Sequence, residues 1–90
     1  MAEQKVSVVI PCYNSQSTIS KVIVGLLSQT VKPLEIILVN DASTDETVKV
    51  VEKYDIKVIN NPVNIGPAAS RNRGFLECQG DIILFIDSNY

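Results

Sequence analysis

Two aspartates stand just after apolar stretches, where a carboxylate can act on a ligand. Asp41 comes after the run 34–39, and its oxygens can accept an N–H from the ring of a base. Asp87 follows residues 82–86, and the segment Asp87-Ser88-Asn89 places two oxygen-bearing side chains two residues apart. That spacing can coordinate a hard divalent cation, which would in turn bridge a diphosphate. Both segments have a structural alternative, because Asp, Ser and Asn also shape turns and helix starts.

Arg71, Arg73 and Tyr13 are further side chains that could meet a ligand. On a helix, Arg71 and Arg73 point in directions about 200° apart, so different roles are expected for them. One is expected to reach Asp41 or a ligand phosphate, and the other to be an ordinary solvated charge. Tyr13 can stack on a flat base or cover the edge of the core. The sequence has no histidine, which removes the commonest general base and metal ligand, so any metal would take oxygen ligands.

Apolar patterning predicts the strands and helices that would position these side chains. Pro11 is predicted to end the first strand, because proline cannot donate to a ladder. Gly66-Pro67 is predicted to open the third helix and Gly80 to end it, and Gly74 to permit close packing on the sheet. The strands are predicted at 6–10, 34–39, 56–59 and 82–86, and the helices at 19–30, 43–54 and 66–80.

Two groups of polar residues are predicted to start the first two helices. Asn14, Ser15 and Ser17 precede the first helical stripe and are typical cap residues. Ser43 and Glu46 have the spacing of a capping box, in which each side chain bonds to the backbone N–H of the other residue.

The alternation of strands and helices predicts an α/β fold, a Rossmann-like parallel sheet of about four strands with flanking helices. In such sheets ligands bind beyond the carboxyl ends of the strands. Polar residues collect at those ends, at 11–14, 40–43, 60–61 and 87–89. Neither GxGxxG nor GxxxxGKS/T follows the first strand, which argues against the dinucleotide-binding and P-loop folds.

Composition limits the classes of protein to which the chain can belong. The 90 residues are 46% hydrophobic and 20% charged, as in one small globular domain. The net charge is −2, and the basic residues form no cluster longer than Arg71-Asn72-Arg73, which argues against a nucleic-acid partner. Cys12 and Cys78 have no metal or redox spacing and are predicted to be packing residues of a cytoplasmic protein. No apolar run approaches the roughly 18 residues of a membrane span, and no signal peptide is recognised.

Four segments carry motifs in a fixed order: VSVVIPCYN (6–14), ILVNDASTD (37–45), NIGPAASRNRG (64–74) and FIDSN (85–89). Together they resemble the N-terminal, nucleotide-binding half of the family 2 glycosyltransferases, which have the GT-A fold. The last segment stands in the place of that family's DxD motif. The resemblance covers the entire chain, and it implies that residues 1–90 are the nucleotide-sugar-binding part of such a domain, truncated after the DxD-like segment.

The resemblance implies a site for a nucleotide-diphosphate sugar, with a UDP-sugar favoured. The segment around Pro11 and Tyr13 would contact the base and ribose, and Asp41 would accept the imide N–H of a uracil-type base. Arg71 would flank the base, and Asp87 would face the ribose and the metal-bound diphosphate. The nucleotide-sugar-binding residues so implied are Pro11, Tyr13, Asn14, Asp41, Ser43, Arg71 and Asp87.

The same resemblance implies a divalent cation, Mn or Mg, bound by Asp87 and Asn89. Asn89 replaces the family's second aspartate, and its neutral amide would bind the metal more weakly. In this family the acceptor-binding surface and the catalytic base follow the DxD segment, so no base is assigned here. The 90 residues alone are therefore expected not to transfer sugar to the carbohydrate or lipid-linked acceptor of the full-length protein.

The strand 82–86 has the apolar pattern of a buried strand. Where the chain stops after it, its edge and the side chains near Phe85 are expected to lack cover. Exposed edges recruit other strands, so a homo-oligomer formed through this edge is expected.

Two other functions remain open from the sequence. One is a non-catalytic nucleotide-binding or structural α/β module, which Asn89 and the missing base would favour. The other is a flavodoxin-like or response-regulator-like domain, in which an aspartate at a strand end accepts phosphate and a later lysine completes the site. The strand 82–86 is followed by no such lysine.

Overall fold

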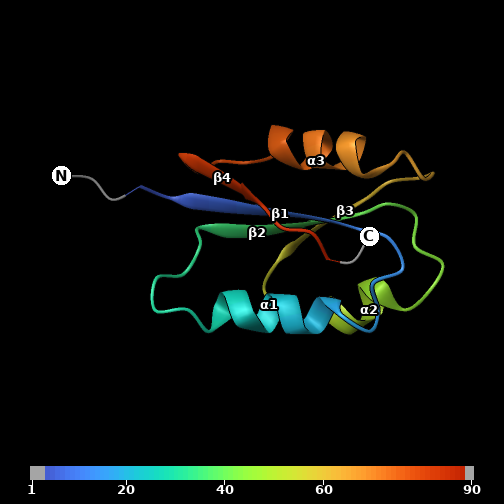
Figure 1. Cartoon of the computed structure of the whole chain (residues 1–90), viewed down its shortest axis with the longest axis horizontal. Coiled ribbons are helices and arrows are strands. Elements are labelled where there is room, and N and C mark those ends of the chain that lie inside the picture. Colours follow the sequence, from blue (N-terminus) through green and yellow to red (C-terminus); the bar gives the residue numbers. More distant parts are fainter. Residues whose placement is uncertain (1–3, 89–90) are drawn as a thin grey trace.

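Within residues 4–88, the part that the computed structural model describes, strands and helices alternate in the predicted order. All the strands are parallel, and they form one sheet in the order β3-β2-β1-β4 (Figure 1). The predicted fold class, an α/β Rossmann-like parallel sheet with flanking helices, is confirmed. The elements are β1 (Val6–Cys12), α1 (Ile19–Leu27), β2 (Glu35–Asn40), α2 (Thr47–Val51), β3 (Lys57–Asn60), α3 (Pro67–Leu76) and β4 (Ile82–Phe85).

The helices cover both faces of the sheet. Figure 1 shows α3 on one face and α1 with α2 on the other. Because successive strand residues face opposite sides, a strand covered on both sides needs apolar side chains at nearly every position. This requirement explains the nearly unbroken apolar runs of β1 and β2. The core under α1 and α2 includes Val8, Ile10, Ile36 and Leu38, and the core under α3 includes Val9, Ile37 and Val39.

Pro11 does not end the first strand, so that prediction is wrong. β1 continues to Cys12, and Pro11 pairs with Val39 in the register of β2. The carbonyl of Val9 accepts from Ile86, on the β4 side of β1. Backbone groups alternate in direction along a strand, so the nitrogen of Pro11 also faces that side, beyond the end of β4. The missing N–H therefore breaks no ladder hydrogen bond.

The starts of α1 and α2 also differ from the prediction. No side chain caps α1; instead the backbone carbonyl of Ser15 accepts the N–H of Thr18 at 3.0 Å. α2 begins only at Thr47, and the predicted capping box is not formed. Asn14 and Ser43 bond to each other instead, the N–H of Asn14 donating to Ser43 Oγ at 3.0 Å. Both helices are shorter than predicted, ending at residues 27 and 51.

Three glycines allow α3 and its flanking loops to lie against the sheet. Gly66 precedes α3 with a φ of 92°, which favours glycine, and Pro67 is its first residue, as predicted. A Cβ on Gly74 would lie 2.5 Å from Val9 Cγ1, so the predicted close packing of the helix is confirmed. Gly80 does not end α3, which stops at residue 76; a Cβ there would lie 2.6 Å from Ser7 Oγ.

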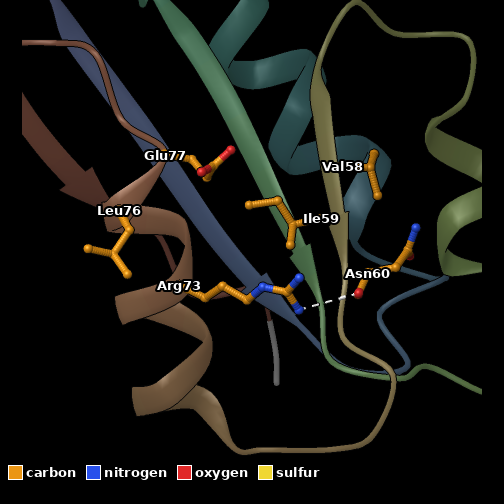
Figure 2. A pocket seen from close by; sticks show the side chains of 6 residues that line it. All are labelled: Val58, Ile59, Asn60, Arg73, Leu76 and Glu77. Atoms are coloured by element: carbon orange, nitrogen blue, oxygen red, sulfur yellow. Dashed lines mark hydrogen bonds between the residues drawn. The ribbon is translucent and has the colours of Figure 1, made fainter.

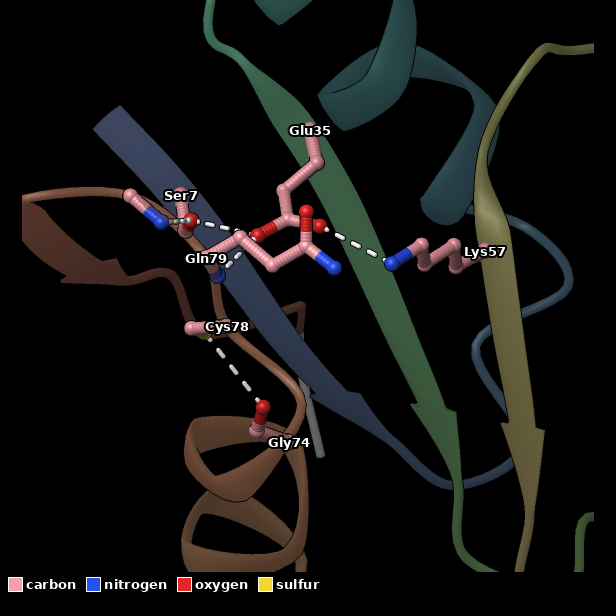
Figure 3. Close-up of polar contacts among 7 residues, drawn as sticks. Ser7, Glu35, Lys57, Gly74, Cys78 and Gln79 are labelled. Carbon is pink, nitrogen blue, oxygen red and sulfur yellow. Dashed lines mark hydrogen bonds and ion pairs between the residues drawn. The ribbon is translucent and has the colours of Figure 1, made fainter. Parts of the chain in front are cut away.

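A polar cluster around Glu35 holds together the amino end of the sheet (Figure 3). The carboxylate of Glu35 accepts from Ser7 Oγ at 2.6 Å and from the N–H of Gln79 at 2.7 Å. Lys57 Nζ lies 3.1 Å from it. Burial raises the pKa of Glu35, but the hydrogen bonds from Ser7 and Gln79, together with Lys57, outweigh burial and lower the pKa. The cluster joins the three strands β1, β2 and β3 to the loop that enters β4.

β4 lies at an edge of the sheet and is poorly covered. Ile82, Leu84 and Phe85 are 42%, 47% and 44% exposed. The apolar pattern of β4 indicates a buried strand, but the strand is largely exposed. The expected lack of cover near Phe85 is confirmed. Among the described residues, none of the helices has both the length and the hydropathy needed to cross a membrane.

Candidate functional site

The loops that follow β1 and β2 form one hydrogen-bonded unit. Besides the bond from its N–H to Ser43, Asn14 accepts at Oδ1 the N–H groups of Thr44 at 2.8 Å and Asp45 at 3.3 Å. Asn14 and Ala42 have φ values of 50° and 62°. This left-handed conformation costs a residue with a Cβ about 1–2 kcal/mol. The structure therefore brings together Asn14 and Ser43, two of the predicted site residues, and the strained residue of this unit is Ala42, which lies next to Ser43.

Asp41 anchors the loop that leads into α3. It is 0% exposed, and its Oδ1 accepts the N–H of Ile65 at 2.7 Å and Nδ2 of Asn61 at 3.0 Å. Its Oδ2 accepts the N–H of Gly66 at 2.9 Å, and its carbonyl accepts Nδ2 of Asn64 at 3.2 Å. The structural alternative, in which Asp41 shapes the chain locally, is thus part of its role. Contact between Asp41 and a base stays a prediction.

Ser88, which follows β4, joins the end of that strand to β1. Ser88 Oγ donates to the carbonyl of Pro11 at 3.2 Å and lies 3.4 Å from Ser15 Oγ. Thr18 Oγ1 donates to the carbonyl of Ser88 at 3.3 Å. Tyr13, which lies between Pro11 and Ser15 in the sequence, is half-buried. The carboxyl ends of β1, β2 and β4 therefore meet at one polar edge of the sheet.

Of the two predicted metal ligands, the structure describes Asp87. Asp87 is exposed, whereas the hydroxyl of Ser88 is buried and directed toward β1. Asn89, the second predicted metal ligand, lies outside the described residues. Within residues 4–88, no three His, Cys, Asp or Glu side chains gather closely enough to hold a metal by themselves. Mg²⁺ is commonly bound through one or two carboxylates together with substrate phosphates, so Asp87 fits a cation shared with a diphosphate.

The two arginines of α3 have different surroundings, as their spacing predicts. Arg73 Nη1 donates to Oδ1 of Asn61 and, at 3.4 Å, to the carbonyl of Asn60. Asn61 in turn donates to Asp41. Arg73 is therefore linked to Asp41 through one intervening amide, and direct contact of an arginine with Asp41 or a ligand phosphate stays a prediction. Arg71 is half-buried, and its contact with a base stays a prediction.

The sequence places Asn61 at a polar strand end and Asn64 and Ser70 in a motif segment, but it does not predict that these three residues are partners within the site. Ser70 is fully buried on α3, and its Oγ accepts Nδ2 of Asn61 at 3.1 Å. A signal was present, because Ser70 and Gly74 are small residues one helical turn apart, which marks the side of α3 that faces the sheet. Asn61 follows β3 directly, at the edge where ligand-binding residues were expected.

The two cysteines are neutral packing residues, as predicted. Both are free thiols. Burial raises the pKa of the Cys12 thiol to about 12, and the nearby Asp45 and Asp41 add to this rise. Burial also raises the pKa of Cys78, which donates to the carbonyl of Gly74 at 3.3 Å (Figure 3).

The fold and these contacts place the protein among the α/β proteins that have a parallel sheet. Its hydrogen-bonded polar site lies at the carboxyl ends of the strands, where such folds bind ligands. The chain belongs to glycosyl transferase family 2, whose family model matches residues 7–89. The predicted family and its GT-A fold are confirmed, and the response-regulator-like alternative is wrong.

Known proteins similar to this chain support that assignment. An uncharacterized glycosyltransferase of Haemophilus influenzae is 35% identical over 89 residues, which cover 93% of this chain and 36% of that protein. The crystal structure of Staphylococcus aureus TarS in complex with UDP has a TM-score of 0.89 at 36% identity, covering 94% of this chain and 27% of that one. Mycobacterium tuberculosis glucosyl-3-phosphoglycerate synthase, solved with Mn²⁺, UDP and glucosyl-3-phosphoglycerate, has a TM-score of 0.82 at 29% identity, covering 94% and 33%. The chain thus spans about a third or less of the length of these relatives.

Proposed function

We propose that residues 1–90 are the nucleotide-sugar-binding part of a family 2 glycosyltransferase whose donor is a UDP-sugar. The observation that supports this most is the hydrogen-bonded edge where β1, β2 and β4 end. That edge belongs to a chain similar in fold to a relative solved with UDP. We propose that Pro11 and Tyr13 contact the base and ribose there, with Asn14 and Ser43 shaping the loops around them.

Asp41 suits recognition of a uracil-type base. An ionised carboxylate only accepts hydrogen bonds, and uracil offers an N–H at its imide nitrogen where cytosine offers a lone pair. Asp41 is 0% exposed, so a base can reach it only if part of the surrounding structure moves. We propose that Arg71 flanks the bound base.

Asp87 is proposed to face the diphosphate and, with it, to hold Mn or Mg, while Asn89 is a second proposed ligand. A bound cation would neutralise negative charge on the departing nucleoside diphosphate. Asp87 suits this role because it is an exposed acidic residue two positions after the end of β4.

Transfer of a glycosyl group to an acceptor hydroxyl is proposed for the longer protein, with a carbohydrate or lipid-linked acceptor. We assign no catalytic base, and we expect residues 1–90 alone to bind the donor without transferring its sugar. A cytoplasmic location remains part of the proposal.

Calorimetric titration of the chain with UDP and GDP, each with and without Mn, tests the proposed function. We expect UDP to bind better than GDP and to bind more tightly with Mn. Asp87→Asn should remove the effect of Mn, whereas Asp55→Asn, an exposed aspartate between α2 and β3, should not. Absence of nucleotide binding in every condition would favour a structural α/β module instead.

We also propose that the edge of β4 pairs with a second copy of the chain. The opposite edge strand, β3, carries the charged Lys57, and charges on an edge discourage pairing. β4 has no charge and exposes Leu84 beside an apolar cavity of about 190 Å³. Sedimentation should show self-association that Leu84→Lys reduces, and a monodisperse wild-type monomer would contradict the proposal.

A further inference from the structure

A groove of about 540 Å³ lies between β3 and α3, next to the proposed nucleotide site. Figure 2 shows Arg73 reaching across it from α3 toward Asn60 at the end of β3. The guanidinium therefore lies between the solvent in the groove and the buried Asn61, which follows β3. The groove is lined by Val58, Ile59, Asn60, Arg73, Leu76 and Glu77.

Behind this groove, Asn61 connects Arg73 to Asp41. Asn61 is 4% exposed, and both ends of its amide are used. Oδ1 accepts from Arg73, while Nδ2 donates to Asp41 Oδ1 at 3.0 Å and to Ser70 Oγ at 3.1 Å. The amide thus has a donor on one side and a carboxylate on the other.

The direction of the Asn61 amide matters, because its two ends have opposite hydrogen-bonding character. A half-turn would exchange oxygen and nitrogen in almost the same space. A guanidinium has donors and no acceptor, so Arg73 is compatible with the amide oxygen alone. With Arg73 in place, the NH₂ group must face Asp41. Without Arg73, the amide is held only through its NH₂ group, by Asp41 and Ser70, so its position is fixed less firmly.

We propose that Arg73 is a positioning residue for the nucleotide site: by fixing the amide of Asn61, it holds the Asp41 carboxylate in the orientation that accepts a base N–H. This inference rests on the proposed function. Arg73 acts through Asn61 and touches no ligand. Lysine could replace it in part, because an ammonium also has donors and no acceptor, although it lacks the planar fork of the guanidinium.

The test compares wild type, Arg73→Ala, Arg73→Lys and Glu77→Gln by calorimetric titration with UDP and with CDP in the presence of Mn. Arg73 and Glu77 are both exposed and line the same groove, so these variants should fold. Arg73→Ala should weaken UDP binding by up to about tenfold, the loss expected for one hydrogen bond. CDP binding should change much less, because the ring nitrogen of cytosine that takes the place of the uracil imide carries a lone pair and no N–H. Arg73→Lys should restore part of the UDP affinity, and Glu77→Gln should match wild type.

A second readout follows the side-chain NH₂ signals of Asn61 by NMR. In wild type we expect one sharp, protected pair, and in Arg73→Ala we expect broadening or a second set. Equal UDP affinity in wild type and Arg73→Ala would overturn the inference while leaving the proposed function intact. An equal loss of UDP and CDP affinity would also overturn it, since that pattern indicates general damage to the site. If the wild type binds no nucleotide, the proposed function fails first and the inference fails with it.

Discussion

Replacing Asp41 with asparagine should destabilise the protein, even though the two side chains have nearly the same shape. The partners of the carboxylate include the N–H groups of Asn61, Ile65 and Gly66. An amide has one acceptor oxygen and one NH₂ group. In its better orientation it keeps the bonds from Asn61 and Ile65 and turns its NH₂ group toward the N–H of Gly66. A buried donor then faces another donor.

The size of the effect follows from the changed contact with Gly66. Loss of one charge-assisted hydrogen bond and burial of an unpaired donor together cost about 2–4 kcal/mol. A chain of 90 residues has a total free energy of unfolding of about 5–13 kcal/mol. Asp41→Asn should therefore fold, with a urea midpoint about 1–2 M lower if the denaturant slope is about 2 kcal/mol/M.

Urea unfolding followed by circular dichroism checks this prediction. Asp55→Asn is the matched control, because Asp55 is exposed and its substitution should change stability by no more than about 0.5 kcal/mol. If Asp41→Asn is as stable as that control, Asp41 does not anchor the loop before α3 and this reasoning is wrong.

The double role proposed for Asp41 affects how binding data should be interpreted. An Asp41 variant that loses UDP binding could do so because its loop moves. Asn64→Ala separates the two causes, since it removes the 3.2 Å hydrogen bond from Asn64 to the carbonyl of Asp41 and leaves the carboxylate in place. We expect Asn64→Ala to retain more UDP affinity than Asp41→Asn. Equal losses would indicate that the loop, and not the carboxylate, determines binding.

Three further predictions concern stability. Gly74→Ala should destabilise by about 1–3 kcal/mol, because its Cβ would lie 2.5 and 3.0 Å from two buried valines. Gly25→Ala in α1, with open space around it, should stabilise by about 1 kcal/mol. The urea midpoint should therefore fall for Gly74→Ala and rise for Gly25→Ala, and equal shifts of the midpoint in the two variants would contradict the packing argument. Ala42→Gly should raise the unfolding free energy by about 0.5–1 kcal/mol by relieving the φ of 62°, and a loss would count against strain. The lowered pKa of Glu35 means that its contribution is present above its unfolded pKa of about 4.3 and is lost as pH falls through the folded pKa. Glu35→Gln should thus flatten the decline in stability as pH falls below about 4.3, and an unchanged slope in acid titrations would refute this role.

The strands were predictable because burial from both sides imposes a simple pattern. A central parallel strand must be apolar at nearly every position, so β2 at 35–40 lies within one residue of its prediction. The helix starts were less predictable. Asn14 and Ser43 are typical cap residues, but they form a hydrogen bond with each other and cap no helix. Pro11 shows the same limit: whether a missing N–H matters depends on where the neighbouring strand ends, which no local pattern contains.

The site was predictable in its location more than in its contacts. Residues at the carboxyl ends of strands must meet in a parallel sheet, which places Asn14, Asp41 and Ser88 at one edge. The link from Arg73 through Asn61 to Asp41 depends on how deeply α3 packs on the sheet. That depth is set by tertiary contacts, so spacing alone could separate the roles of the two arginines but could not assign them.

The central claim is that a uridine nucleotide binds at the carboxyl ends of the strands, and NMR of the ¹⁵N-labelled chain titrated with UDP and Mg²⁺ tests it most directly. The account predicts shifts in the backbone amides of residues 12–14, 41–44, 64–66 and 87–88, with little change in the cluster around Glu35 at the other end of the sheet. No shifts at saturating UDP, or shifts confined to the Glu35 end, would contradict it.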